Sequence, residues 1–161
     1  MKVHEVGPPI NTGALLAGAQ FADAFCIEVG GQCIDARKAA QRMMGRSSCW
    51  IEALLTLRHL VVAPFGLKTS GKNERPPRET IGVFPILTET PDRLVAGFND
   101  KHLDFRVVVD VATFGVESGS GQQVTATTLV KTHNLFGRIY LAIILPFHRL
   151  IVPAMLRKIA V

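Results

Sequence analysis

The stretch Gly137–Arg157, GRIYLAIILPFHRLIVPAMLR, is the most apolar part of the chain, yet it carries two prolines, a histidine and an arginine in its interior. Only nine mainly apolar residues separate Arg138 from His148, well short of the ~20 that a membrane-spanning helix needs. His148 and Arg149 would lie near the centre of a bilayer if the whole stretch crossed it. The stretch therefore predicts a soluble helix, buried on most sides, and no transmembrane span.

The two prolines predict that this helix is bent. Pro146 cannot donate a backbone hydrogen bond to the Ala142 carbonyl, and Pro153 cannot donate one to the Arg149 carbonyl. We expect the bend near Pro146. Arg138 and Arg149 are about three turns apart, so they share one edge of the helix. The opposite side collects His148 and four apolar residues: Leu141, Ile144, Val152 and Met155.

Composition predicts a globular cytoplasmic domain. Hydrophobic residues make up 48% of the 161 residues and charged residues 19%, which excludes a disordered chain. The first residues, MKVHEVGPPINTG, contain no apolar segment typical of a secretory signal. Cys26, Cys33 and Cys49 have no CxxC spacing, so buried thiols in a reducing cytoplasm are expected rather than disulfides or a zinc site. The net charge of +5 comes without interleaved aromatics or a nucleic-acid-binding motif, which favours a solvated basic face.

Local patterns predict helices after a first strand. Phe21–Val29 alternates as a strand does, and Gly30-Gly31 ends it. Asp35 is placed to cap a helix that Gly45 ends. A second helix would begin at Ser47 or Ser48, and Pro64 would end it.

Four further strands and the apolar helix complete the expected fold. The strands are Ile81–Glu89, Arg93–Phe98, His102–Thr113 and Val124–His133, with a hairpin turn at Asn99-Asp100. Asn134 is placed to cap the final helix. This order predicts an α+β fold in which an antiparallel sheet carries its helices on one face.

Alternation along His102–Thr113 predicts a polar face that meets water. His102, Asp104 and Arg106 lie on this face, and Asp100 comes just before them. A histidine beside a carboxylate can perform acid–base chemistry, so these four residues form a candidate functional cluster. The alternative is a solvated outer face with cross-strand ion pairs.

Two other motifs do not support a cofactor or a metal. Gly66–Asn73, GLKTSGKN, nearly matches a phosphate-binding loop, but a helix precedes it and Pro76-Pro77 prevent the helix that should follow. We expect Gly66–Thr80 to be a mobile polar loop without nucleotide contact. His133 and His148 are fifteen residues apart and no third ligand is suggested, so no metal site is expected.

Several longer stretches resemble the bacterial DUF2867 family, whose function is unassigned. These are WIEALLTLRHLVV with FGLK, PILTETPDRLVAGFNDKHLDFR, HNLFGRIYL and PFHRLIV. The resemblance covers the chain from about Phe21 onward, which implies an N-terminal extension over residues 1–20 and one domain over residues 21–161.

The element order of this family is similar to the helix-grip fold of the START/Bet v 1-like (SRPBCC) superfamily. The resemblance implies a curved antiparallel sheet that wraps the long C-terminal helix and leaves an apolar cavity between them. Some similar proteins are fused to an NAD(P)-binding short-chain reductase domain, which implies a reductase-domain partner. The chain contains no GxGxxG, so a nicotinamide role does not carry over and no cofactor is expected.

The expected function is the binding of a small apolar or amphipathic molecule in that cavity. Its expected lining residues are Phe105, Val107, Tyr140, Ile144, Phe147 and His148. Two alternatives stay open: a cyclase-like or hydratase-like enzyme with His148 as its acid–base group, and a structural or interaction module whose core is filled. A homodimer is an open alternative for the partner, and nucleic acid is not expected to bind.

Overall fold

The computed structural model describes residues 2–31, 33–45, 79–115 and 121–160. The helix expected from Ser47 or Ser48, the GLKTSGKN motif and most of the loop Gly66–Thr80 lie outside these residues, so their expected structure stays a prediction.

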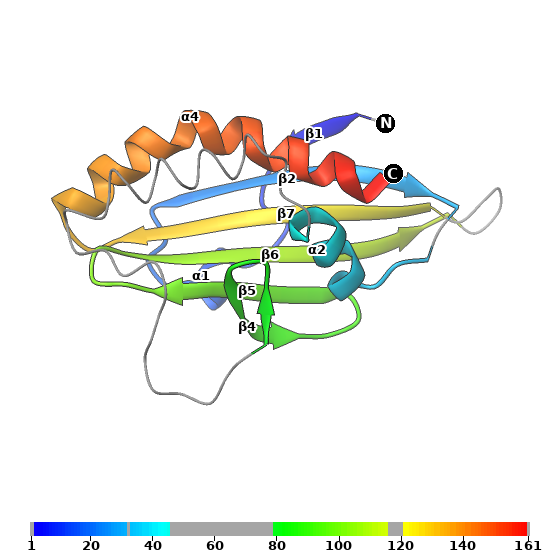
Figure 1. Ribbon diagram of the computed structural model, residues 1–161, viewed down its shortest axis with the longest axis horizontal. Helices are drawn as coiled ribbons and strands as arrows, with labels where there is room; N and C mark the ends of the chain where they lie inside the picture. The colour runs from blue at the N-terminus through cyan, green and yellow to red at the C-terminus, as the bar shows by residue number, and fades with distance from the viewer. Residues whose placement is uncertain (1, 32, 46–78, 116–120, 161) are drawn as a thin grey trace.

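Seven antiparallel strands form one curved sheet in the order β1-β2-β7-β6-β5-β4-β3 (Figure 1). The strands are β1 (Val3–Val6), β2 (Phe21–Gly30), β3 (Thr80–Ile81), β4 (Phe84–Glu89), β5 (Arg93–Asn99), β6 (Leu103–Phe114) and β7 (Gly121–Thr132). The helical elements are α1 (Thr12–Leu15), α2 (Ala36–Met44), the long α4 (Leu135–Arg157) and the final 3-10 turn η2 (Lys158–Ala160). The α+β helix-grip arrangement is confirmed, and residues 1–20 contribute β1 and α1 to it.

Helix boundaries follow the capping residues. The Asp35 carboxylate accepts a hydrogen bond from the Lys38 amide at 2.7 Å at the start of α2. The Asn134 side chain accepts one from the Gly137 amide at 2.9 Å at the start of α4. Each bond satisfies one amide that the helix itself leaves unpaired. Both predicted caps are confirmed, as is Gly45 at the end of α2.

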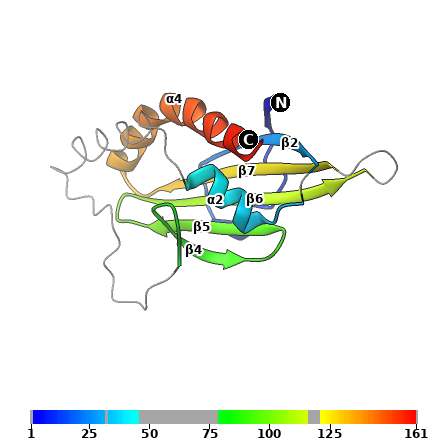
Figure 2. The same cartoon turned by 45° about the vertical axis from the view of Figure 1, so that its right-hand side comes forward.

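The core lies between the sheet and its two longer helices. Figures 1 and 2 show α4 lying along β2 and β7, with α2 crossing β5 and β6 near the C-terminal end of α4. Neighbouring strands place Phe25, Ala126, Val109 and Leu94 in one buried row on this side. Val152 and Leu156 of α4 pack into the same core. We call this side of the sheet the inner face.

The opposite face of the sheet does not meet water as expected. Val108, Thr127 and Leu129 lie on it and are fully buried. Part of the chain after α1 lies against this face, because Leu16 is buried and a Cβ on Gly18 would lie 3.5 Å from the Lys131 side chain. The expectation of a solvated face was wrong, since strand alternation shows which residues share a face and not what covers it.

Two ion pairs lie on this face of the sheet. Arg93 and Asp110 stand opposite each other on β5 and β6, and their side chains form an ion pair at 2.5 Å. Asp104 pairs with His133, from Nε2 to Oδ1 at 3.0 Å. Of the residues in the predicted cluster, Asp104 is the one that forms an ion pair with a described residue.

The C-terminal stretch is helical, but it is not buried on most sides. Pro146 and Pro153 both lie inside α4, and the helix arches over the sheet in Figure 1. Its buried residues are Gly137, Val152 and Leu156. By length and composition, Leu135–Ala160 is the one helix in the described ranges that could cross a membrane. The expectation of burial on most sides was wrong, because α4 lies on the sheet along one side only.

A close backbone contact seats the first turn of α4 on the turn between β5 and β6. A Cβ on Gly137 would lie 2.2 Å from the His102 carbonyl oxygen, far inside van der Waals distance. The His133 amide donates to the same carbonyl at 2.9 Å. Glycine is therefore required at position 137 by the lack of space.

We expect Gly137→Ala to lower the free energy of unfolding by about 1–3 kcal/mol, the usual cost of overpacking. Urea unfolding of the variant measures this loss. Gly7→Ala is the matched control, because a Cβ at Gly7 would meet nothing within 4 Å. Equal stability of the two variants would contradict the close contact.

A charge cluster joins α2 to the sheet edge. Arg37 donates to Glu79 at 2.6 Å and to Glu89 at 2.6 Å. The pKa of Glu89 is lowered below its ordinary value of 4.5, because the Arg37 guanidinium hydrogen-bonds to its charged form.

Since the folded-state pKa of Glu89 is the lower one, this pair stabilises the fold above pH 4.5 and ceases to do so as the pH falls through the folded pKa. We therefore expect Arg37→Gln to be less stable than the wild type at neutral pH, with the difference vanishing in acid. Unfolding measured across the pH range tests this, with Lys38→Gln as the control. A difference that persists in strong acid would argue against the pair.

Candidate functional site

A histidine–carboxylate pair lies between α4 and the inner face of the sheet. His148 on α4 donates from Nε2 to Asp23 Oδ1 on β2 at 3.1 Å, and Oδ2 of the same carboxylate lies 3.0 Å from that nitrogen. The exposed fractions of the two side chains are 16% for His148 and 8% for Asp23. The strand and the helix thus hold an ionisable pair in a largely buried position.

The pair has unused hydrogen-bonding capacity. The Nε2 proton of His148 faces both oxygens of the buried Asp23 carboxylate, and a carboxylate oxygen can accept a second hydrogen bond. Because Nε2 of a neutral ring carries the proton donated to Asp23, Nδ1 of His148 is left as an acceptor. Both open positions therefore accept hydrogen bonds, and a ligand that meets them must donate one.

Aromatic side chains extend from this pair across the inner face. The Phe21 ring lies edge-on to the His148 ring, with centroids 6.1 Å apart. Strand register places Phe21, Val130, Phe105 and Phe98 in one row across β2, β7, β6 and β5. Phe84 of β4 joins the far end of the row, with ring centroids 5.1 Å from Phe105 and 6.2 Å from Phe98. These three rings are only partly buried.

The structure assembles only part of the predicted lining set around this pair. Phe105 packs against the inner-face core and Val107 is buried in it. Tyr140 and Ile144 are partly buried, as residues on the side of α4 nearer the sheet should be. Phe147 lies on the outer side of α4 with 41% of its surface exposed, so it does not share that interface.

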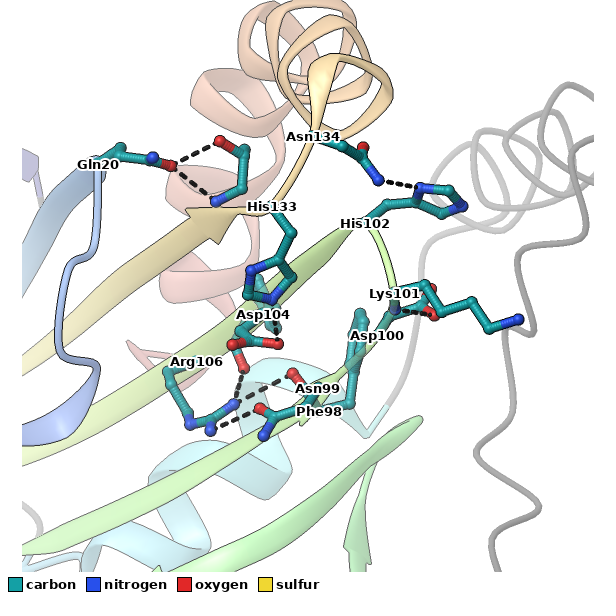
Figure 3. A network of polar contacts seen from close by, with 12 residues as sticks. Gln20, Phe98, Asn99, Asp100, Lys101, His102, Asp104, Arg106, His133 and Asn134 are labelled. Carbon is teal, nitrogen blue, oxygen red and sulfur yellow. Dashed lines mark hydrogen bonds and ion pairs between the residues drawn. The ribbon is translucent and has the colours of Figure 1, made fainter.

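The predicted cluster Asp100, His102, Asp104 and Arg106 is a separate network at the start of α4 (Figure 3). His102 Nδ1 lies 2.8 Å from the Asn134 side-chain nitrogen, and its ring packs 4.7 Å from the Phe136 ring. Asp100 accepts a hydrogen bond from the Lys101 amide at 2.6 Å. The two contacts of His102 hold the hairpin turn against the start of α4.

Arg106 binds the end of β5 in the same network. It donates to the Asn99 side chain at 2.7 Å and to the Phe98 carbonyl at 3.1 Å. Burial lowers the pKa of the Arg106 guanidinium, and the neighbouring Asp104 partly raises it again. Since Asp104 pairs with His133 and Arg106 binds the Phe98 carbonyl, the cluster is best explained as the support of the hairpin and the helix cap.

The described residues contain no group of three or more His, Cys, Asp or Glu side chains that could hold a metal ion. Cys26 is buried as expected, whereas Cys33 is exposed, so the expectation of buried thiols was wrong for Cys33. Cys49 lies outside the described residues.

Asp23 is the candidate site residue that sequence analysis missed. It falls on the same face of its strand as Phe21, Phe25 and Ile27, where an apolar residue is expected. A carboxylate in that position has to be paired once the face is buried, and this is the signal that could have found it. Its partner is 125 residues away in the sequence, so local patterns could not name it.

We expect the neutral His148 ring to carry its proton on Nε2, because Asp23 accepts from that nitrogen. Two-bond proton–nitrogen NMR spectra distinguish the two tautomers directly. Asp23→Leu should remove the preference, while the exposed His4 serves as an unchanged reference in the same spectra. A ring protonated on Nδ1 in the wild type would contradict the observed pairing.

The family model described as "Protein of unknown function (DUF2867)" matches residues 15–155. No curated protein and no solved structure matches the chain. The match includes strands β2 to β7 and most of α4, and therefore both members of the histidine–carboxylate pair. On this evidence the chain belongs to the DUF2867 family.

Proposed function

We propose that the chain binds a small amphipathic molecule between α4 and the inner face of the sheet, with Asp23 and His148 as its polar anchor. The observation that carries the proposal is the largely buried Asp23–His148 pair, whose carboxylate contacts one imidazole N–H through both of its oxygens. A hydrogen bond to a charged group contributes about 1.5–3 kcal/mol. A ligand that donates a hydrogen bond to this carboxylate would gain that free energy.

The arrangement narrows the chemistry of the ligand. Because both open positions of the pair accept, the ligand would carry a hydroxyl group rather than a bare carbonyl. Its apolar part would lie along the row from Phe21 to Phe105. These two residues stand on strands separated by β7 alone, which corresponds to about 10 Å. A flat or aromatic alcohol of that length would reach from the anchor to Phe105, and apolar walls with few polar groups are typical of small-molecule sites.

The same proposal includes a relationship to the START/Bet v 1-like superfamily. The antiparallel sheet packed against a long C-terminal helix supports this relationship, and in that superfamily a ligand would be expected between the sheet and this helix. Native mass spectrometry of the purified protein would identify a co-purified molecule.

Titration with naphthol, a fluorescent aromatic alcohol, tests the anchor directly. The methyl ether of naphthol is the matched probe, because it lacks only the hydrogen-bond donor. We expect naphthol to bind more tightly than the ether to the wild type. His148→Phe should weaken naphthol binding by about 1–3 kcal/mol and leave the ether little affected.

His4→Phe is the control, since His4 is exposed on the edge strand β1. Equal affinity of the two probes for the wild type would contradict the hydroxyl anchor. Failure of both probes to bind, together with the absence of any co-purified molecule, would favour the alternative of a structural module with a filled core.

One observation favours an enzyme as the second candidate. A carboxylate that holds an imidazole by one nitrogen leaves the other nitrogen poised as a general base. A cyclase-like or hydratase-like reaction would use the same site with His148 as the acid–base group. Asp23→Asn should then retain binding of the co-purified molecule and slow its conversion, whereas for a binding protein no conversion would be seen in either form.

A further inference from the structure

The outer side of α4 carries a continuous apolar stripe. Five large apolar side chains each expose 41% or more of their surface. They are Leu135, Ile139, Ile143, Phe147 and Leu150. Successive members are four, four, four and three residues apart, the spacing of one helix face. We call these five residues the outer stripe. Exposed apolar surface of this continuity on a soluble protein marks an interaction site.

Basic residues follow one edge of the outer stripe. Arg138 and Arg149 are both exposed, and neither forms an ion pair with a described residue. Arg157 is exposed in the last turn. Leu135–Arg157 contains no Asp or Glu, so the positive edge is not balanced within the helix. A partner for this face should combine an apolar interior with a negatively charged rim.

We propose that the outer stripe docks onto the surface of an anionic lipid bilayer, with α4 lying in the plane of the headgroups. The inner side of the helix is held in the protein core by Val152 and Leu156, so α4 lies on the membrane rather than across it. The stripe enters the boundary between headgroups and acyl chains. Arg138 and Arg149 extend their charged ends to the lipid phosphates.

The charges disfavour a second copy of the chain as the occupant. The outer stripe is centred on Ile143, and Arg138 and Arg149 lie at similar distances on either side of it. An antiparallel two-fold pairing around Ile143 would therefore place Arg138 of one copy beside Arg149 of the other. Like charges held together in this way are destabilising, and the helix offers no carboxylate to offset them.

Cosedimentation with lipid vesicles tests the proposal. The full chain is mixed with vesicles of phosphatidylcholine alone or of phosphatidylcholine with phosphatidylglycerol. We expect the wild type to sediment with the anionic vesicles and only weakly with the neutral ones. Added salt should weaken the binding, because it screens the arginine contribution.

Two double variants and one single variant separate the apolar contribution to vesicle binding from the electrostatic one. Ile143→Gln with Leu150→Gln keeps good helix formers and should reduce the partition constant by at least about tenfold. Arg138→Gln with Arg149→Gln should reduce binding to anionic vesicles by about tenfold or more and leave binding to neutral vesicles unchanged. Val83→Gln is the matched control and should have no effect, because Val83 is an exposed apolar residue on another part of the fold.

Three outcomes would overturn the proposal. The first is wild-type protein that stays in solution with both kinds of vesicle. The second is a dimer in solution that the Ile143→Gln and Leu150→Gln changes dissociate, which would make the stripe a contact between copies. The third is a large loss of thermal stability in that double variant, which would show that another part of this chain covers the stripe.

Discussion

The contact between Gly137 and the His102 carbonyl is the constraint on which the site depends. It seats the first turn of α4 on the hairpin turn, and the course of the helix then determines where every later residue falls. His148 follows Gly137 by eleven residues, or about 16 Å along the helix axis. That distance brings its ring over β2 and within 3.1 Å of Asp23. A backbone contact at one end of the helix therefore positions the His148 side chain, which lies near the middle of the helix.

Local physics made most of the fold predictable from the sequence. Asp35 and Asn134 cap their helices because a short polar side chain can satisfy a free amide within its own turn. The longer strands were predictable because apolar and polar residues alternate along many of their positions. β1 was not foreseen, since four residues at an edge, Val3–Val6, carry too little pattern to distinguish a strand from an extended loop.

The features that escaped prediction all depend on what lies opposite a residue in space. Asp23 sits on an apolar face because His148, far along the chain, supplies its partner. Asp110 turns away from the core and is still largely buried, paired with Arg93 across the hairpin. In each case a buried carboxylate is tolerated because it forms an ion pair or a hydrogen bond, with an arginine at Asp110 and with an imidazole at Asp23. Sequence alternation assigns such residues to a face but cannot say what covers that face.

In α4 the unexpected residues are apolar side chains in exposed positions. A helix on the surface of a soluble domain normally has one apolar and one polar side. α4 has an apolar inner side in the core and an apolar outer stripe, separated along one edge by Arg138 and Arg149. The inner side explains why the helix binds the sheet, yet it cannot explain why Ile143 or Leu150 is apolar. Exposing these apolar side chains to water costs free energy, and that cost is removed only when a binding partner buries them. The unbalanced positive charge along one edge favours a partner that is negatively charged.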